Sequence, residues 1–111
     1  MPHFVVRLAR GGPWDWSRGM REQADWEQHA RYMDELVEDG FIVLGGPLEG
    51  DREVIEIVEA GSEEEVRARL AEDVWATTGL LTPVSVERWT ILLDGRDPAT
   101  WAPKKNGPDG L

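Results

Sequence analysis

The sequence contains no cysteine and only two histidines among its 111 residues. The lack of cysteine excludes disulfides, iron–sulfur clusters, zinc ribbons and a cysteine nucleophile, and the two imidazoles show no metal-ligand spacing. We therefore expect neither a metal nor another cofactor. No apolar run approaches the roughly 20 residues that cross a bilayer, so no membrane partner is expected. The first residues do not combine a basic segment with a long apolar one, as a signal peptide does, and we expect a cytoplasmic protein.

Basic residues are also scarce, since 12 lysines and arginines face 22 acids and give a net charge of −10. Nucleic acids are bound through clusters of basic side chains, so this balance argues against a nucleic-acid partner. The excess is local: residues 32–73 hold fourteen acids and three bases, whereas residues 1–31 hold four acids and five bases. The six tryptophans and the 41% of hydrophobic residues nevertheless predict a folded core.

The apolar patterning predicts one domain over residues 1–93 and a proline- and glycine-rich tail over residues 94–111. In chain order we expect a strand over 3–9, a helix over about 20–39 that ends at Gly40, a strand over 41–44, a strand over 53–60, a helix that starts after Ser62 and runs to about 70–72, a connection over 73–79, and a strand over 81–93. This order of elements is that of the ferredoxin-like α+β fold, with a four-stranded antiparallel sheet and two helices on one face.

The expected strands over 41–44 and 53–60 are apolar on both faces, although one face of such a sheet is not covered by helices. A large apolar patch in water favours association. We therefore predict a homodimer that packs sheet against sheet, as a dimeric α+β barrel. The alternative is that the tail folds back over this face, with Trp101 as its anchor.

His29 is the most informative candidate, because it lies on the edge of an apolar helical stripe. Histidine changes its charge near neutral pH and serves as a general acid or base, but a buried histidine with one hydrogen bond is the simpler interpretation. A catalytic histidine needs a carboxylate that orients it. Asp25 lies one turn earlier on the same helix and Asp73 follows the second helix, and the spacing alone does not choose between them.

Four further residues are candidates for substrate binding. Trp14 and Trp16 either cover a pocket and stack on a flat ligand or anchor a long loop to the core. Trp75 is expected in the core or in the pocket wall. Arg7 either pairs with an anionic group of a substrate or forms a salt bridge with one of the many acids.

Taken together, these residues resemble the pattern of the YCII-related (YciI-like) family over residues 3–93. The pattern has a histidine on the first helix, a glycine eleven residues later, a short strand that ends in Gly-Pro, an aspartate and an aromatic residue after the second helix, then a glycine and a strand that ends in an aromatic residue. Here these elements are His29, Gly40, the strand that leads to Gly46-Pro47, Asp73 with Trp75, Gly79, and the strand that leads to Trp89. Val74 stands where the family has a proline.

The resemblance implies a dimeric ferredoxin-like barrel, similar to muconolactone isomerases, with His29 and Asp73 as the pair of the active site. Members with known activity resemble cofactor-free enzymes that act on ring compounds, including one that removes chloride from a chlorinated hydroxyquinol. The leading hypothesis is a cofactor-independent lyase or isomerase for a small ring metabolite. A binding module without catalysis and a cofactor-free monooxygenase are the two alternatives.

Overall fold

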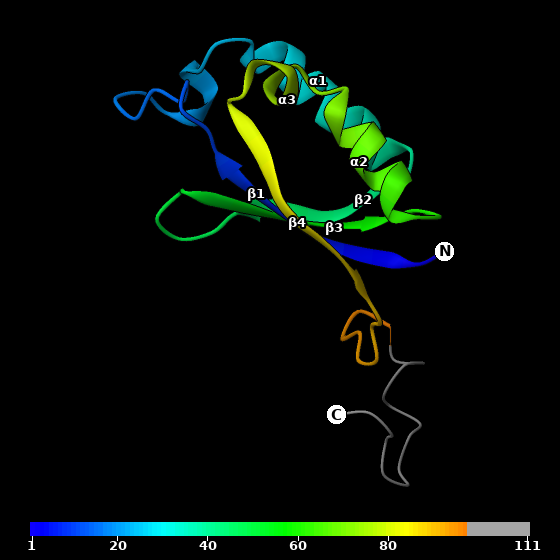
Figure 1. Ribbon diagram of the computed structural model, residues 1–111. Helices are drawn as coiled ribbons and strands as arrows, with labels where there is room; N and C mark the ends of the chain where they lie inside the picture. Colours follow the sequence, from blue (N-terminus) through cyan, green and yellow to red (C-terminus); the bar gives the residue numbers. More distant parts are fainter. Residues whose placement is uncertain (98–111) are drawn as a thin grey trace, which may run out of the picture.

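The computed structural model describes residues 1–97 and confirms the ferredoxin-like arrangement. Its elements are β1 (His3–Arg10), the 3-10 turn η1 (Met20–Glu22), α1 (Trp26–Glu38), β2 (Ile42–Pro47), β3 (Glu53–Glu59), α2 (Glu63–Ala71), α3 (Val74–Thr78) and β4 (Leu81–Trp89). The strands form one antiparallel sheet in the order β2-β3-β1-β4. The helices lie together on one side of this sheet (Figure 1).

The core lies between the sheet and the helices. Successive side chains of a strand point to opposite faces, so alternate residues of β1 face the helices. Val6, in the middle of β1, is fully buried, as are Leu36 of α1 and Val66 of α2. The helices are therefore held to the sheet mainly by burial of apolar surface, at roughly 25 cal/mol for each Å² removed from water.

The first helix begins later than the sequence predicted. Residues 20–22 form only a 3-10 turn, and Asp25 has a left-handed backbone with a φ of 61°, so that α1 starts at Trp26. A left-handed residue cannot continue a right-handed helix, which explains the break. The predicted end is confirmed: Gly40 has a φ of 80° directly after α1, a conformation that glycine adopts without strain.

The expected connection over residues 73–79 is wrong, because Val74–Thr78 form the short helix α3. The carboxylate of Asp73 caps this helix by accepting a hydrogen bond from the backbone N–H of Trp75 at 3.2 Å. The side chain of Trp75 is fully buried. One cap and one large buried side chain thus stabilise a helix too short to show periodicity in the sequence.

Two strand ends also differ from the prediction. The strand β4 ends at Trp89, not at residue 93, because Trp89 pairs with His3, the first residue of β1, and the described residues that follow, 90–97, form no strand. The strand β2 runs on to Pro47, since its last residue still pairs with Val54 of β3. A proline is tolerated there because β2 is an edge strand.

The face of the sheet away from the helices is partly apolar, as expected. Leu44 of β2 is 54% exposed and Trp89 of β4 is 43% exposed. Val5, Ile55 and Ile57 are partly exposed on the neighbouring strands. The predicted role of Trp101 concerns a residue outside the described ones.

None of the helices formed by residues 1–97 is long and apolar enough to span a membrane.

Candidate functional site

The histidine of α1 and the aspartate before α3 form a buried pair. His29 is 7% exposed and Asp73 is 3% exposed. The Nδ1 atom of His29 lies 2.8 Å from Oδ2 and 3.0 Å from Oδ1 of Asp73. A carboxylate only accepts hydrogen bonds, so Nδ1 carries a hydrogen, and in the neutral imidazole Nε2 is then the acceptor. Within residues 1–97, Nε2 has no hydrogen-bond partner, which leaves this nitrogen free to accept a proton.

Trp75 fixes the position of this pair. Its indole Nε1–H donates a hydrogen bond of 2.7 Å to the backbone carbonyl of Ala24, which joins α3 to the segment before α1. Its ring stacks on the imidazole of His29, with the two ring centroids 3.7 Å apart and the planes 8° from parallel. Because Asp73 also caps α3, the imidazole and the carboxylate are both held by the same short helix.

Two more tryptophans pack around the stacked rings of His29 and Trp75. The ring of Trp26 lies 5.8 Å from the rings of both His29 and Trp75. Trp14 packs edge-on against Trp75, with centroids 5.2 Å apart, and the guanidinium of Arg10 lies 4.0 Å from the centre of the Trp14 ring. These rings keep water from most of the imidazole, which strengthens its electrostatic interaction with the aspartate.

Asp25, the other carboxylate that spacing allowed, does not pair with the imidazole. Its backbone carbonyl accepts a hydrogen bond of 3.0 Å from the N–H of His29, as the first bond of α1. The left-handed backbone of Asp25 places it outside the helical turn that the i, i+4 argument assumed. The structure therefore brings Asp73 to His29, from 44 residues further along the chain.

Two hollows adjoin the pair. The α1 cleft, of about 550 Å³, lies between α1 and β2, and His29 and Trp26 line it. The α2 cavity, of about 320 Å³, lies between α2 and the sheet, and Asp73 lines it. Glu56, Met33 and Leu81 line both. Hollows of a few hundred Å³ take small metabolites, so the pair lies beside space for a ligand.

Glu56 is the acid that the sequence analysis missed. It lies on β3 between Val54 and Val58 and is 5% exposed. Burial, and then the negative charge of Asp73, raise the pKa of the Glu56 carboxyl from 4.5 to about 7. The signal was present in the sequence, because in a strand with a period of two residues Glu56 falls on the same face as Val54 and Val58.

The structure does not bring Arg7 and Trp16 to His29. Arg7 lies on the opposite face of the sheet, where its guanidinium pairs with Glu53. Trp16 is 54% exposed, and its ring lies under the guanidinium of Arg52 at 5.5 Å. Trp75 stacks on the imidazole and Trp14 packs against Trp75, but the residues that line the α1 cleft and the α2 cavity include neither tryptophan. Their predicted roles in substrate binding stay predictions.

Within the part of the chain that the structure describes, no group of three or more histidine, aspartate or glutamate residues is arranged to hold a metal ion.

The fold and the pair define a ferredoxin-like α+β domain with a buried histidine–aspartate pair beside two hollows. The family model of the YCII-related domain matches residues 4–90, and the chain belongs to this family, as the sequence motifs indicated. A search of curated proteins and a search of solved structures found no match to the chain.

Proposed function

We propose that this protein is an acid–base enzyme of the lyase or isomerase type, independent of a cofactor, which acts on a small ring metabolite through His29 and Asp73. The observation that carries the proposal is the hydrogen bond between Nδ1 of His29 and the Asp73 carboxylate, which leaves Nε2 unpaired at the α1 cleft. A carboxylate in this position fixes the tautomer of a catalytic histidine and stabilises the imidazolium that forms when Nε2 takes a proton.

The chemistry that fits this arrangement is proton abstraction from a carbon next to a carbonyl group. Nε2 of His29 removes the proton, and the negative charge of Asp73 stabilises the resulting imidazolium. The imidazolium then returns the proton to another carbon, which is an isomerisation, or the electrons expel a leaving group, which is an elimination. The largely apolar lining of the α1 cleft, where His29 is found, favours a ring compound over a highly charged one.

The test is exchange of hydrogen between substrate and solvent. A panel of lactones, catechols and hydroxyquinols is incubated with the protein in D₂O, and deuterium incorporation and product formation are followed by NMR. We expect at least one compound to react and His29→Gln to lower its rate by about 10²–10⁴-fold. The matched control is His3→Gln, because His3 is the other histidine and lies at the edge of β1, away from the site.

Three outcomes contradict the proposal. Equal rates for the wild type and His29→Gln would show that His29 does not take part in the reaction. Binding of panel compounds without any turnover would favour the binding module, and a requirement for oxygen would favour the monooxygenase.

The tautomer of His29 offers a second test that needs no substrate. In the wild type, the ¹⁵N resonances of the ring should show hydrogen on Nδ1. In Asp73→Asn the amide is able to donate, so Nδ1 is able to accept and the hydrogen is free to move to Nε2. An unchanged tautomer would show that Asp73 does not set it.

We further propose that two copies of the chain form a dimer through the face of the sheet away from the helices. The support is the row formed by Leu44 of β2, Ile57 of β3 and Val5 of β1, which pair across the strands on that face. Exposed apolar rows of this kind are typical of interfaces between chains.

A further inference from the structure

Of the three glutamates of β3, Glu56 is the one on the face of the sheet that packs against the helices. Glu56 pairs with Val6 of β1 on one side and with Gly45 of β2 on the other. A Cβ atom at Gly45 would lie 3.4 Å from Cγ of Glu56, which is ordinary van der Waals contact, so the two residues lie directly beside each other. Val54 and Val58, two residues away along the strand, are both buried. A carboxyl group in such a place destabilises the fold unless it is hydrogen-bonded.

One oxygen of this carboxyl group, Oε1 of Glu56, is buried without a hydrogen-bond partner among the described residues. Two of the three guanidinium groups that line the hollows bind other carboxylates: Arg67 donates to Glu63 at 2.8 Å and Arg10 donates to Asp51 at 3.0 Å. The third, Arg21, makes no hydrogen bond to Glu56 within residues 1–97. More than nine in ten buried polar groups in proteins are hydrogen-bonded, so an unpaired one calls for an explanation.

The surroundings of Glu56 favour the protonated form. The ionisable residues that line the hollows with it are His29 and Asp34 of α1, Arg67 of α2, Asp73 before α3, and Arg10 and Arg21 from the β1 side and η1. The residues that β4 contributes are apolar. Burial is the larger cause of the raised pKa of Glu56, and the charge of Asp73 adds to it.

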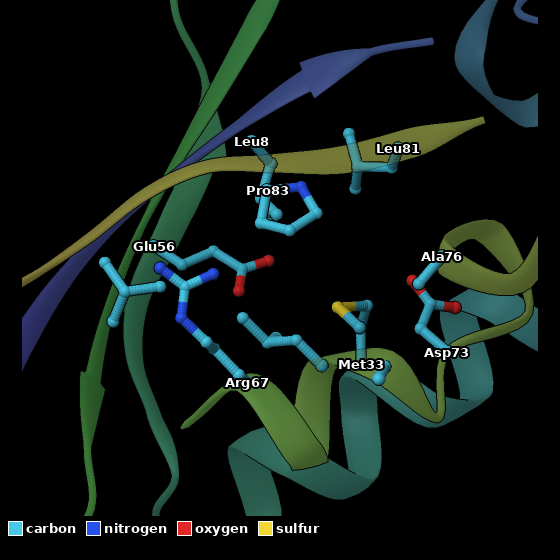
Figure 2. A pocket seen from close by; sticks show the side chains of 11 residues that line it. Leu8, Met33, Glu56, Arg67, Asp73, Ala76, Leu81 and Pro83 are labelled. Carbon is cyan, nitrogen blue, oxygen red and sulfur yellow. The ribbon is translucent and has the colours of Figure 1, made fainter. Parts of the chain in front are cut away.

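The carboxyl group also lies where a ligand would contact it. Glu56 extends from the sheet into the α2 cavity, with Asp73 on the opposite side and Met33 between them (Figure 2). Glu56 lines the α1 cleft as well, where His29 is found. It is therefore the acidic group common to both hollows.

We propose that Glu56 is a proton donor of the site, which donates a hydrogen bond from its carboxyl group to the carbonyl oxygen of an uncharged ring ligand. This inference rests on the proposed function and adds a second group to it. When Nε2 of His29 takes the proton from carbon, the electrons of the C–H bond move into the carbonyl group, and its oxygen takes the proton of Glu56. An enol, an imidazolium and the Glu56 carboxylate result, and the reverse transfers restore both groups.

The experiment measures binding of phthalide, a bicyclic lactone with one carbonyl group, by NMR titration at pH 5.5 and 8.5. The protonated fraction of a group with a pKa of about 7 falls to about 3% at pH 8.5, so the wild type should bind phthalide about 30-fold more weakly there. Glu56→Gln keeps a donor at both pH values, and its dissociation constant should change less than about twofold. Glu56→Leu should bind weakly at both.

Two controls make the comparison specific. Indane has a similar ring system but no oxygen, so its binding should not depend on pH in any variant. Glu38→Gln alters an exposed acid of α1 and should keep the pH dependence of the wild type. The inference is overturned by phthalide binding that is equal at both pH values in the wild type, by a pH dependence that persists in Glu56→Gln, or by no binding to the wild type at pH 5.5.

This outcome is separate from that of the proposed function, since phthalide binding requires no turnover. If His29→Gln leaves the reaction rate unchanged and phthalide binding still depends on pH through Glu56, the proposed enzyme activity is rejected and the role of Glu56 as a donor is kept. If His29 is essential for turnover but phthalide binding does not depend on pH, the enzyme activity is kept and the role of Glu56 as a donor is rejected.

Discussion

Replacing Glu56 by glutamine should change how the stability of this protein depends on pH. The pKa of Glu56 is raised from 4.5 to about 7 in the folded protein. Between these values the folded state binds more protons than the unfolded state. The contribution of protonated Glu56 to the free energy of unfolding is therefore fully present below pH 4.5 and is lost as the pH rises through 7. At about 1.4 kcal/mol for each tenfold change in proton affinity, the whole loss is about 3 kcal/mol.

Glutamine does not titrate, so the variant lacks this loss. Urea unfolding, followed by the fluorescence of the six tryptophans, is measured from pH 4.5 to 8.5 for both proteins at one protein concentration. The difference between the two curves cancels the other titrating groups. We expect Glu56→Gln to gain about 3 kcal/mol on the wild type across this range, which is a shift of about 1–3 M urea in the midpoint.

The same titration separates the two causes of the raised pKa. Asp73→Asn removes the negative charge that adds to burial, so stability should fall less steeply with pH, whatever the variant costs in absolute stability. Glu38→Gln, at an exposed position on α1, should follow the wild type. Parallel curves for Glu56→Gln and the wild type would refute the reasoning, because they would mean that Glu56 ionises as readily in the folded as in the unfolded chain.

Three other predictions concern the frame around the site. Trp75→Phe loses the indole hydrogen bond to Ala24 and should lower the free energy of unfolding by about 1–3 kcal/mol, measured by urea unfolding. In Gly11→Ala the new Cβ would lie 1.8 Å from a carbonyl oxygen of the α3–β4 turn, whereas the space around Gly12 is open. The first variant should therefore cost about 1–3 kcal/mol by the same assay, and Gly12→Ala, its matched control, should cost much less. Ile57→Asp should turn the proposed dimer into a monomer in light scattering, while Ile57→Val should not; a monomeric wild type at micromolar concentration would contradict the dimer.

The fold was predictable because most of its strands and helices have local sequence patterns that mark where they begin and end. Short apolar runs, bounded by glycine and proline, marked the strands. Gly40 and Ser62 marked a helix end and a helix start, which the structure confirms. The helix α3 was not predictable in this way. Its five residues are too few to show a period, and they are helical because Asp73 caps them and Trp75 is buried.

The site was predictable only in part. His29 was visible as a titratable residue on an apolar stripe, but its partner depended on how α3 packs against α1. Glu56 was missed for a different reason. The apolar residues of β3 on both faces suggested a strand buried on both sides, and this impression concealed one acid on the face that packs against the helices.

The distribution of acidic residues along the chain points to the same two side chains as the geometry of the site. Of the fourteen acids in residues 32–73, Glu56 and Asp73 are the two that are buried. Asp73 is satisfied, since its carboxylate accepts from the imidazole of His29 and from the backbone N–H of Trp75. Glu56 has an unpaired oxygen in a hollow that Asp73 also lines. Two acids so close in a core would repel each other if both were ionised, and only one of them has donors that stabilise its charge. The asymmetry assigns the charge to Asp73 and the proton to Glu56, which is the division that an acid–base site requires.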